Sequence, residues 1–154
     1  LLTKMINEIE NLTCFKIESA NAASKIRALI KNCSERLDAP FDGEESITLY
    51  ADLEAGISGS MSSALLPEKI APVIDHFWNN EKDKSEEIYN NILPLINFEN
   101  RQCGFRATKT VMKEGGIIKS DFCRDPIKPL DQDTKNLLLN FAKRYDLLTY
   151  KWGK

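Results

Sequence analysis

The chain has 154 residues and a mass of 17.5 kDa, enough for one domain, since domains usually contain ~100–200 residues. Apolar residues make up 42% and charged residues 29%, close to the globular average, so the composition excludes wholesale disorder. The net charge of −2 does not favour a nucleic-acid binder that neutralises phosphates. No apolar stretch approaches the ~18–20 residues of a membrane helix, so we expect no membrane association.

The four cysteines lie far apart in the sequence. Cys14, Cys33, Cys103 and Cys123 form no CxxC pair and no cluster with histidine. This spacing does not favour structural zinc or a dense disulfide framework. We therefore expect no metal site, reduced thiols and a cytoplasmic location.

The first predicted elements are a strand and a helix. Residues 13–18 (TCFKIE) alternate with a period of two, which predicts a strand. Asn21 is a suitable cap for the helix that follows. The apolar positions of that helix follow i, i+3, i+4, i+7 spacing: Ile26, Leu29, Ile30 and Cys33.

Two further strands are predicted, at residues 37–41 and 57–62. Between them, Asp42 at the N-cap and Glu45 at the third helical position predict a capping box. Strands that alternate with helices at this spacing indicate parallel βα units, hence an α/β fold. A three-stranded parallel sheet has two bare edges, so we expect residues 1–65 to belong to a larger sheet.

The second part of the chain, residues 66–154, is predicted to be almost wholly helical. One helix is expected to start with Pro67 in its first turn, and another to end at Gly115. A last helix is expected to start near Asp131 or Asp133.

Lys16 and Glu18 lie on the same face of the first predicted strand. Phe15 and Ile17 alternate with them and are expected to pack against helices. Lys16 and Glu18 would then point to the interior, near the strand's carboxyl end, where α/β folds place their sites. A desolvated lysine more readily loses its proton, and the neutral amine can form a Schiff base with a carbonyl. The alternative is an edge strand with both side chains in water.

Small residues surround the third predicted strand. The run Gly-Ile-Ser-Gly-Ser-Met-Ser-Ser at residues 56–63 lets a ligand approach the backbone, whose N–H groups can hold a carboxylate. A flexible or tightly packed strand end is the alternative, and the small residues by themselves favour it. His76, the only histidine, has no nucleophile motif beside it and is expected to be a partly buried helix residue.

Four segments together resemble the dihydrodipicolinate synthase / N-acetylneuraminate lyase superfamily. They are Phe15-Lys-Ile-Glu18, Asp42-Gly-Glu-Glu45, Gly56-Ile-Ser-Gly-Ser-Met-Ser62 and Arg124-Asp-Pro-Ile-Lys-Pro-Leu130. Within that superfamily, the combination is most similar to dehydratases of 2-keto-3-deoxy sugar acids, of the 2-keto-3-deoxyarabonate type. Synthase members of the superfamily usually carry other residues than this chain directly after the lysine and in the last strand.

The resemblance implies the C-terminal part, strands six to eight, of a TIM (β/α)8 barrel in residues 1–65. Residues 66–154 would form the last barrel helix and a helical C-terminal region. A full barrel contains about 250 residues. We therefore expect this chain to be the C-terminal half of a longer protein, usually a homotetramer in this superfamily, and to be inactive alone.

The resemblance also implies a chemistry. Lys16 would be the imine-forming lysine, and the partner would be a small 2-oxo acid, with no cofactor. The implied substrate-binding residues are Gly59, Ser60 and Met61. Glu18 is added to the substrate pocket because it alternates onto the same face as Lys16.

Two other functions remain open at this point. The first is an aldolase of the dihydrodipicolinate synthase or N-acetylneuraminate lyase type. The second is a non-catalytic helical interaction module, in which residues 66–154 bind a partner and Lys16 is a surface residue.

Overall fold

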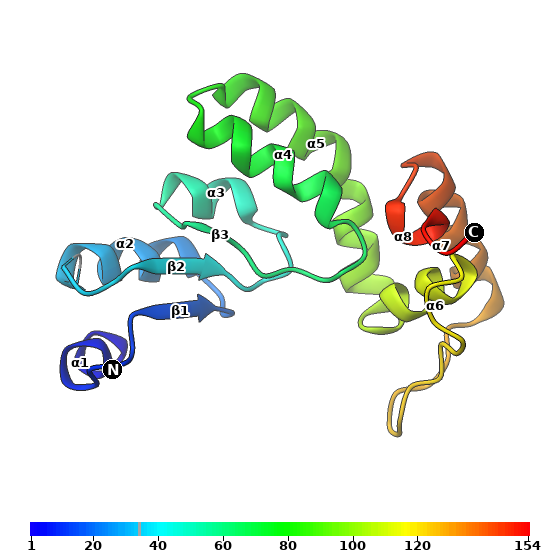
Figure 1. The fold of residues 1–154 in the computed structure, drawn as a ribbon, viewed down its shortest axis with the longest axis horizontal. Coiled ribbons are helices and arrows are strands. Elements are labelled where there is room, and N and C mark those ends of the chain that lie inside the picture. The colour runs from blue at the N-terminus through cyan, green and yellow to red at the C-terminus, as the bar shows by residue number, and fades with distance from the viewer. Residues whose placement is uncertain (34) are drawn as a thin grey trace.

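The computed structural model describes residues 1–33 and 35–154 of the chain (Figure 1). Its N-terminal part alternates helices and strands, and its C-terminal part is helical. The elements are α1 (Leu2–Glu8), β1 (Cys14–Ile17), α2 (Ala22–Cys33), β2 (Ala39–Asp42), α3 (Leu49–Glu54), β3 (Gly59–Ser60), α4 (Pro67–Trp78), α5 (Lys82–Phe98), the π-helix η1 (Glu99–Cys103), α6 (Arg106–Glu114), α7 (Gln132–Arg144) and α8 (Leu148–Lys151).

The three strands form one parallel sheet in the order β1-β2-β3. Ile17 lies beside Asp42, and Asp42 beside Ser60, so the three carboxyl ends are level with one another. The predicted parallel βα arrangement is therefore confirmed, with strands shorter than the sequence pattern indicated. Because the strands are parallel, the segments that follow them all leave the same edge of the sheet.

One face of β1 packs into the hydrophobic core as predicted. Ile17 is buried, and Phe15 packs against the same core, whereas Lys16 between them is exposed. The apolar stripe of α2 covers this face, with Ile26 and Leu29 buried. The apolar side of β1 repeats every two residues and that of α2 about every 3.6 residues. The two apolar sides pack against each other here.

The helices α4 and α5 pack against each other along their length (Figure 1). The buried Ser85 hydroxyl donates to the Val73 carbonyl across this pair, at 2.7 Å. From α5, the Tyr89 hydroxyl donates to the carbonyls of Ser46 and Ile47, at 3.1 and 2.5 Å. These bonds attach the helical pair to the turn that follows β2.

The C-terminal helices return to the loop between β3 and α4. Asp131 caps α7 by accepting from the Thr134 N–H, which confirms the first of the two predicted starts. From α8, the Thr149 hydroxyl donates to the Leu65 carbonyl at 2.7 Å, and the Leu148 N–H donates to Glu68. The end of the chain therefore holds the segment that follows β3.

No helix within residues 1–33 and 35–154 has both the length and the apolar character needed to cross a bilayer. All four cysteines are free thiols.

Candidate functional site

Lys16 lies near the carboxyl end of β1 and turns away from the core. Its Nζ is 3.1 Å from Glu18 Oε2, and 36% of the Lys16 side chain is exposed. The aliphatic stem runs across Gly43: a Cβ at Gly43 would lie 2.8 Å from Lys16 Cγ and 2.9 Å from Cε. Gly43 therefore lets the lysine lie against the turn after β2, a role that the sequence pattern alone did not indicate.

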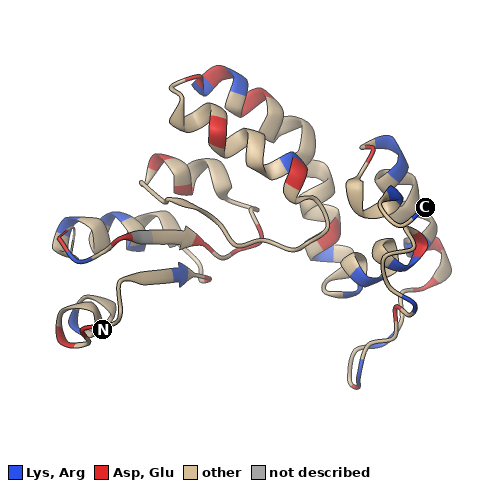
Figure 2. Ribbon diagram, in the orientation of Figure 1, with Lys and Arg blue, Asp and Glu red and all other residues tan. Residues whose placement is uncertain are grey.

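Glu18 follows β1 directly and is the ion-pair partner of Lys16. Its side chain is 62% exposed, so the pair lies at the open edge of the sheet. Figure 2 shows the same charge pattern, with a basic segment at the end of β1 and acidic segments just beyond β1 and β2. The structure thus brings Lys16 and Glu18 together, as predicted from their shared strand face.

The three residues predicted around β3 have different surroundings. Gly59 is buried against Phe41, whose Cε1 would lie 3.0 Å from an added Cβ. The Ser60 hydroxyl donates to Asp42 Oδ2 at 2.6 Å and lies 2.8 Å from the Ser46 hydroxyl. Met61 is exposed, and its N–H donates to the Asp42 carbonyl. Met61 is therefore the most accessible of the three, and the Ser60 hydroxyl is engaged within the protein.

Asp42 organises the turn after β2, but not through the predicted capping box. It is fully buried and accepts from the N–H groups of Glu44 and Ser46, each at 3.0 Å, besides the Ser60 hydroxyl. Glu45 and Ser46 have positive φ angles of 55° and 66°, so no helix can start there, and α3 begins only at Leu49. The capping-box prediction is wrong because Asp42 bonds to a tight turn and to the neighbouring strand.

Glu45 and Glu99 line a cavity of about 340 Å³ beyond the strand ends. Ser63 and Thr108 also line it, and both hydroxyls donate to Glu99 Oε1, Thr108 at 3.3 Å. Glu99 is only 4% exposed, and burial raises its pKa to about 7. Burial also raises the pKa of Glu45, while the Lys16 charge acts in the opposite direction.

The sequence analysis missed this cavity. It assigned Glu45 to a helix start and gave Glu99 no role. Glu99, Ser63 and Thr108 lie in η1, the β3–α4 loop and α6, and no local spacing pattern links them. A buried glutamate becomes visible only once the helices are packed.

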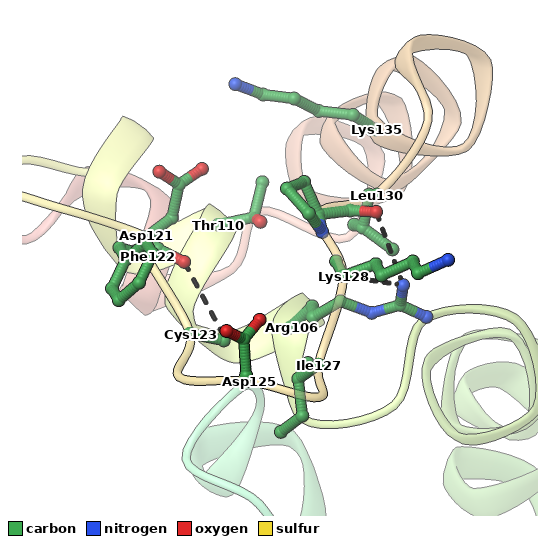
Figure 3. Close-up of a pocket in the computed structure, with 11 residues that line it drawn as sticks. Arg106, Thr110, Asp121, Phe122, Cys123, Asp125, Ile127, Lys128, Leu130 and Lys135 are labelled. Carbon is green, nitrogen blue, oxygen red and sulfur yellow. Dashed lines mark hydrogen bonds between the residues drawn. The ribbon is translucent and has the colours of Figure 1, made fainter.

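A second cavity, of about 410 Å³, lies between α6, α7 and the segment before α7 (Figure 3). The Arg106 guanidinium is turned to that segment and donates to the Lys128 carbonyl at 2.9 Å. Arg106 also bonds the Cys103 carbonyl, so its charge holds backbone in place. Figure 1 shows α6 and α7 at the opposite end of the molecule from β1, so this cavity is not part of the strand-end site.

The part of the chain that the structure describes has no group of three or more His, Cys, Asp or Glu side chains placed to hold a metal ion. His76 is partly buried in α4, and its Nδ1 is hydrogen-bonded to Glu81. The side chains at the strand ends include the Lys16 amine, the carboxyl groups of Glu18 and Asp42, and the Ser60 hydroxyl.

Comparison with known proteins gives consistent matches. Residues 2–144 match the dihydrodipicolinate synthetase family. Over 152 residues, the chain is 42% identical to the L-2-keto-3-deoxyarabonate dehydratase of Azospirillum brasilense, a match that covers 99% of this chain and 49% of that protein.

Solved structures match at lower identity. The dihydrodipicolinate synthase of Aquifex aeolicus matches with a TM-score of 0.83 at 22% identity, over 95% of this chain and 49% of that one. The enzyme of Rhodopseudomonas palustris matches with a TM-score of 0.82 at 21% identity, over 93% and 49%. The chain thus spans about half the length of the proteins that it matches and shares the fold of that half.

Proposed function

Because the chain belongs to the dihydrodipicolinate synthetase family, we propose that it carries the imine-forming part of a lyase that dehydrates a 2-keto-3-deoxy sugar acid. The observation that carries the proposal is the 42% identity to a 2-keto-3-deoxyarabonate dehydratase along almost the whole chain. The position of Lys16 at the strand ends supports it, because parallel α/β folds bind substrates there.

In this proposal, β1, β2 and β3 are strands six, seven and eight of a (β/α)8 barrel. Residues 1–65 are its last βα units, and residues 66–154 are the last barrel helix and a helical extension. The strands before β1, and the groups they carry, belong to the remaining length of the protein, which we propose is a cytoplasmic homotetramer. The match to about half of each synthase chain supports this assignment.

The proposed reaction starts at the Lys16 amine. The neutral amine attacks the C2 carbonyl of the substrate, and water leaves as the imine forms. The imine withdraws electrons and acidifies C3, a base removes a C3 proton, and the C4 hydroxyl leaves with a proton as water. The Lys16 Nζ lies 3.1 Å from Glu18 Oε2, and this ion pair positions the lysine side chain at the strand ends.

The proposed substrate-binding residues Gly59, Ser60 and Met61 lie in and just after β3, which is separated from the strand of Lys16 by β2. Gly59 is buried against Phe41 within β3, whereas Met61 offers an accessible side chain one residue beyond that strand. The Ser60 hydroxyl bonds to Asp42 in the structure. We therefore propose that Ser60 acts by holding β3 against β2, whereas Met61 contacts the 2-oxo acid.

Borohydride trapping tests the proposal. The full-length protein is treated with pyruvate and borohydride, and the modified peptide is identified by mass spectrometry. We expect one reduced pyruvyl adduct on Lys16, and none in the Lys16→Arg variant. A folded protein that gives no adduct at Lys16 would overturn the imine mechanism.

The solved synthase structures keep an aldolase or synthase as the second candidate. The product separates the two, because a dehydratase keeps the carbon skeleton and releases water, whereas an aldolase cleaves the substrate and releases pyruvate. Release of pyruvate from a 2-keto-3-deoxy sugar acid would favour the aldolase.

A further inference from the structure

The cavity lined by Glu45, Ser63, Glu99 and Thr108, here called the Glu99 cavity, has a chemistry that the imine mechanism does not use. Ala64, Asn100, Gly104 and Phe105 complete its lining. Its volume of about 340 Å³ is within the range of small-ligand sites. The polar side chains that line it carry hydroxyl, amide or carboxyl groups, which can form hydrogen bonds with sugar hydroxyls.

Glu99 is the most deeply buried polar group of this cavity. Ser63 and Thr108 both donate to Glu99 Oε1. In the described residues, Oε2 of Glu99 accepts no hydrogen bond and is not among the fully enclosed polar atoms, so it stays accessible within the cavity that Glu99 lines. An accessible carboxyl oxygen that no protein group donates to is available as an acceptor for a ligand hydroxyl.

Glu45 connects the cavity to the imine lysine. It lines the cavity, and its Oε2 is fully buried without a partner among the described residues. The charge of Lys16 lowers the pKa of Glu45, and the charge of Glu45 raises that of Glu99. Glu45 is therefore electrostatically coupled to both Lys16 and Glu99.

We propose that the Glu99 cavity binds the hydroxyl-bearing tail of the 2-oxo acid whose carbonyl reacts with Lys16, with Glu99 Oε2 hydrogen-bonded to a tail hydroxyl. This inference rests on the proposed function, since it places the two ends of one substrate. Ser63 and Thr108 hold Oε1 in place and leave Oε2 to the ligand. The cavity thus selects for a polyhydroxy acid over a short 2-oxo acid.

The test compares two substrates in the full-length protein and in Glu99→Gln. Gln keeps the carbonyl that Ser63 and Thr108 bond to and replaces Oε2 by a donor. Because one hydrogen bond is worth about tenfold in affinity, we expect KM for a 2-keto-3-deoxy sugar acid to rise about tenfold. Pyruvate has no tail, so its borohydride trapping at Lys16 should keep its half-saturating concentration.

Glu68→Gln is the matched control. Like Glu99, Glu68 accepts a hydrogen bond through Oε1 and none through Oε2 among the described residues, but it lies in α4 and does not line the Glu99 cavity. This variant should leave KM for the sugar acid unchanged. If Glu99→Gln does not fold, Thr108→Val, which removes one cavity hydroxyl at constant shape, should raise KM for the sugar acid and leave pyruvate trapping unaffected.

The outcomes separate the two proposals. Failure of pyruvate trapping in the unaltered protein removes the proposed function itself. Normal trapping with an unchanged KM for the sugar acid in the Glu99 variant, or in Thr108→Val where that one stands in, overturns the cavity proposal alone. An equal loss for both substrates also overturns it, because that result indicates a general structural role.

Discussion

The path of the Lys16 side chain depends on a residue without a side chain. Lys16 lies so close to the turn after β2 that a Cβ at Gly43 would come within 2.9 Å of the Ile17 carbonyl oxygen as well as of the lysine stem. These distances are shorter than a van der Waals contact, so either the turn or the lysine has to move. The amine position therefore requires glycine at 43.

Gly43→Ala should displace Lys16. We expect the rate of pyruvate trapping to fall at least about tenfold, since a displacement near 1 Å at a reacting group has large effects. Overpacking should also lower the free energy of unfolding by about 1–3 kcal/mol. Trapping kinetics and urea unfolding measure the two effects.

Gly104→Ala is the control for this prediction. Gly104 has a φ of 62°, so alanine is strained there, but an added Cβ meets no atom within 4 Å. This variant should lose stability and keep its trapping rate. Equal trapping rates in Gly43→Ala and the unaltered protein would show that Gly43 does not set the lysine position.

At the scale of elements, the turn between β2 and α3 joins strands to helices. The Asp42 carboxylate accepts hydrogen bonds from backbone N–H groups of this turn and from the Ser60 hydroxyl of β3. The Tyr89 hydroxyl of α5 donates to a carbonyl of the same turn. Three elements thus depend on one buried carboxylate. The sequence pattern indicated the strand and the helix on either side, but placed the helix start several residues too early.

Asp42→Ala should therefore destabilise the protein strongly. It leaves two backbone N–H groups and one hydroxyl without their acceptor, which we expect to lower the free energy of unfolding by about 2–4 kcal/mol. Chemical denaturation followed by circular dichroism measures the loss. Asp83→Ala, an exposed position in the first turn of α5, should change it by less than about 0.5 kcal/mol.

At the scale of the whole molecule, Glu99 joins three segments that are distant in sequence. It lies in η1 and bonds to the β3–α4 loop through Ser63 and to α6 through Thr108. Its pKa of about 7 in the folded protein exceeds the ordinary value of 4.5 because the carboxyl is buried. Burial also raises the pKa of Asp52, to about 6.

These raised pKa values determine the sign of a pH effect. Below about pH 4.5 the Glu99 carboxyl is protonated in both the folded and the unfolded chain. Between the two pKa values only the unfolded chain ionises, so stability falls as the pH rises through this window and then stays lower. Because one pKa unit corresponds to about 1.4 kcal/mol, the loss is at most a few kcal/mol.

Glu99→Gln should remove the part of the pH dependence of stability that arises from the Glu99 carboxyl. We expect the variant to gain stability relative to the unaltered protein between pH 4.5 and 7, as measured by thermal unfolding at a series of pH values. Asp52 is present in both proteins, so the difference between them reports Glu99. A difference that does not vary with pH would contradict the assignment.

The sequence by itself determined the local features of this protein. Alternation at Phe15, Lys16 and Ile17 predicted which side of β1 is buried, and the helical stripe at Ile26 and Leu29 predicted the face of α2, because both patterns depend on backbone geometry alone. The resemblance predicted the family for the same reason, since its motifs are short and continuous.

Only the tertiary structure decided which distant groups meet. The contact of Lys16 with Gly43, the turn around Asp42 and the burial of Glu99 beside Ser63 and Thr108 join residues from different elements. Their environment depends on how helices pack over strand ends, and a desolvated carboxyl has no signature in local sequence. The amine was therefore predictable from its strand, and the cavity next to it was not.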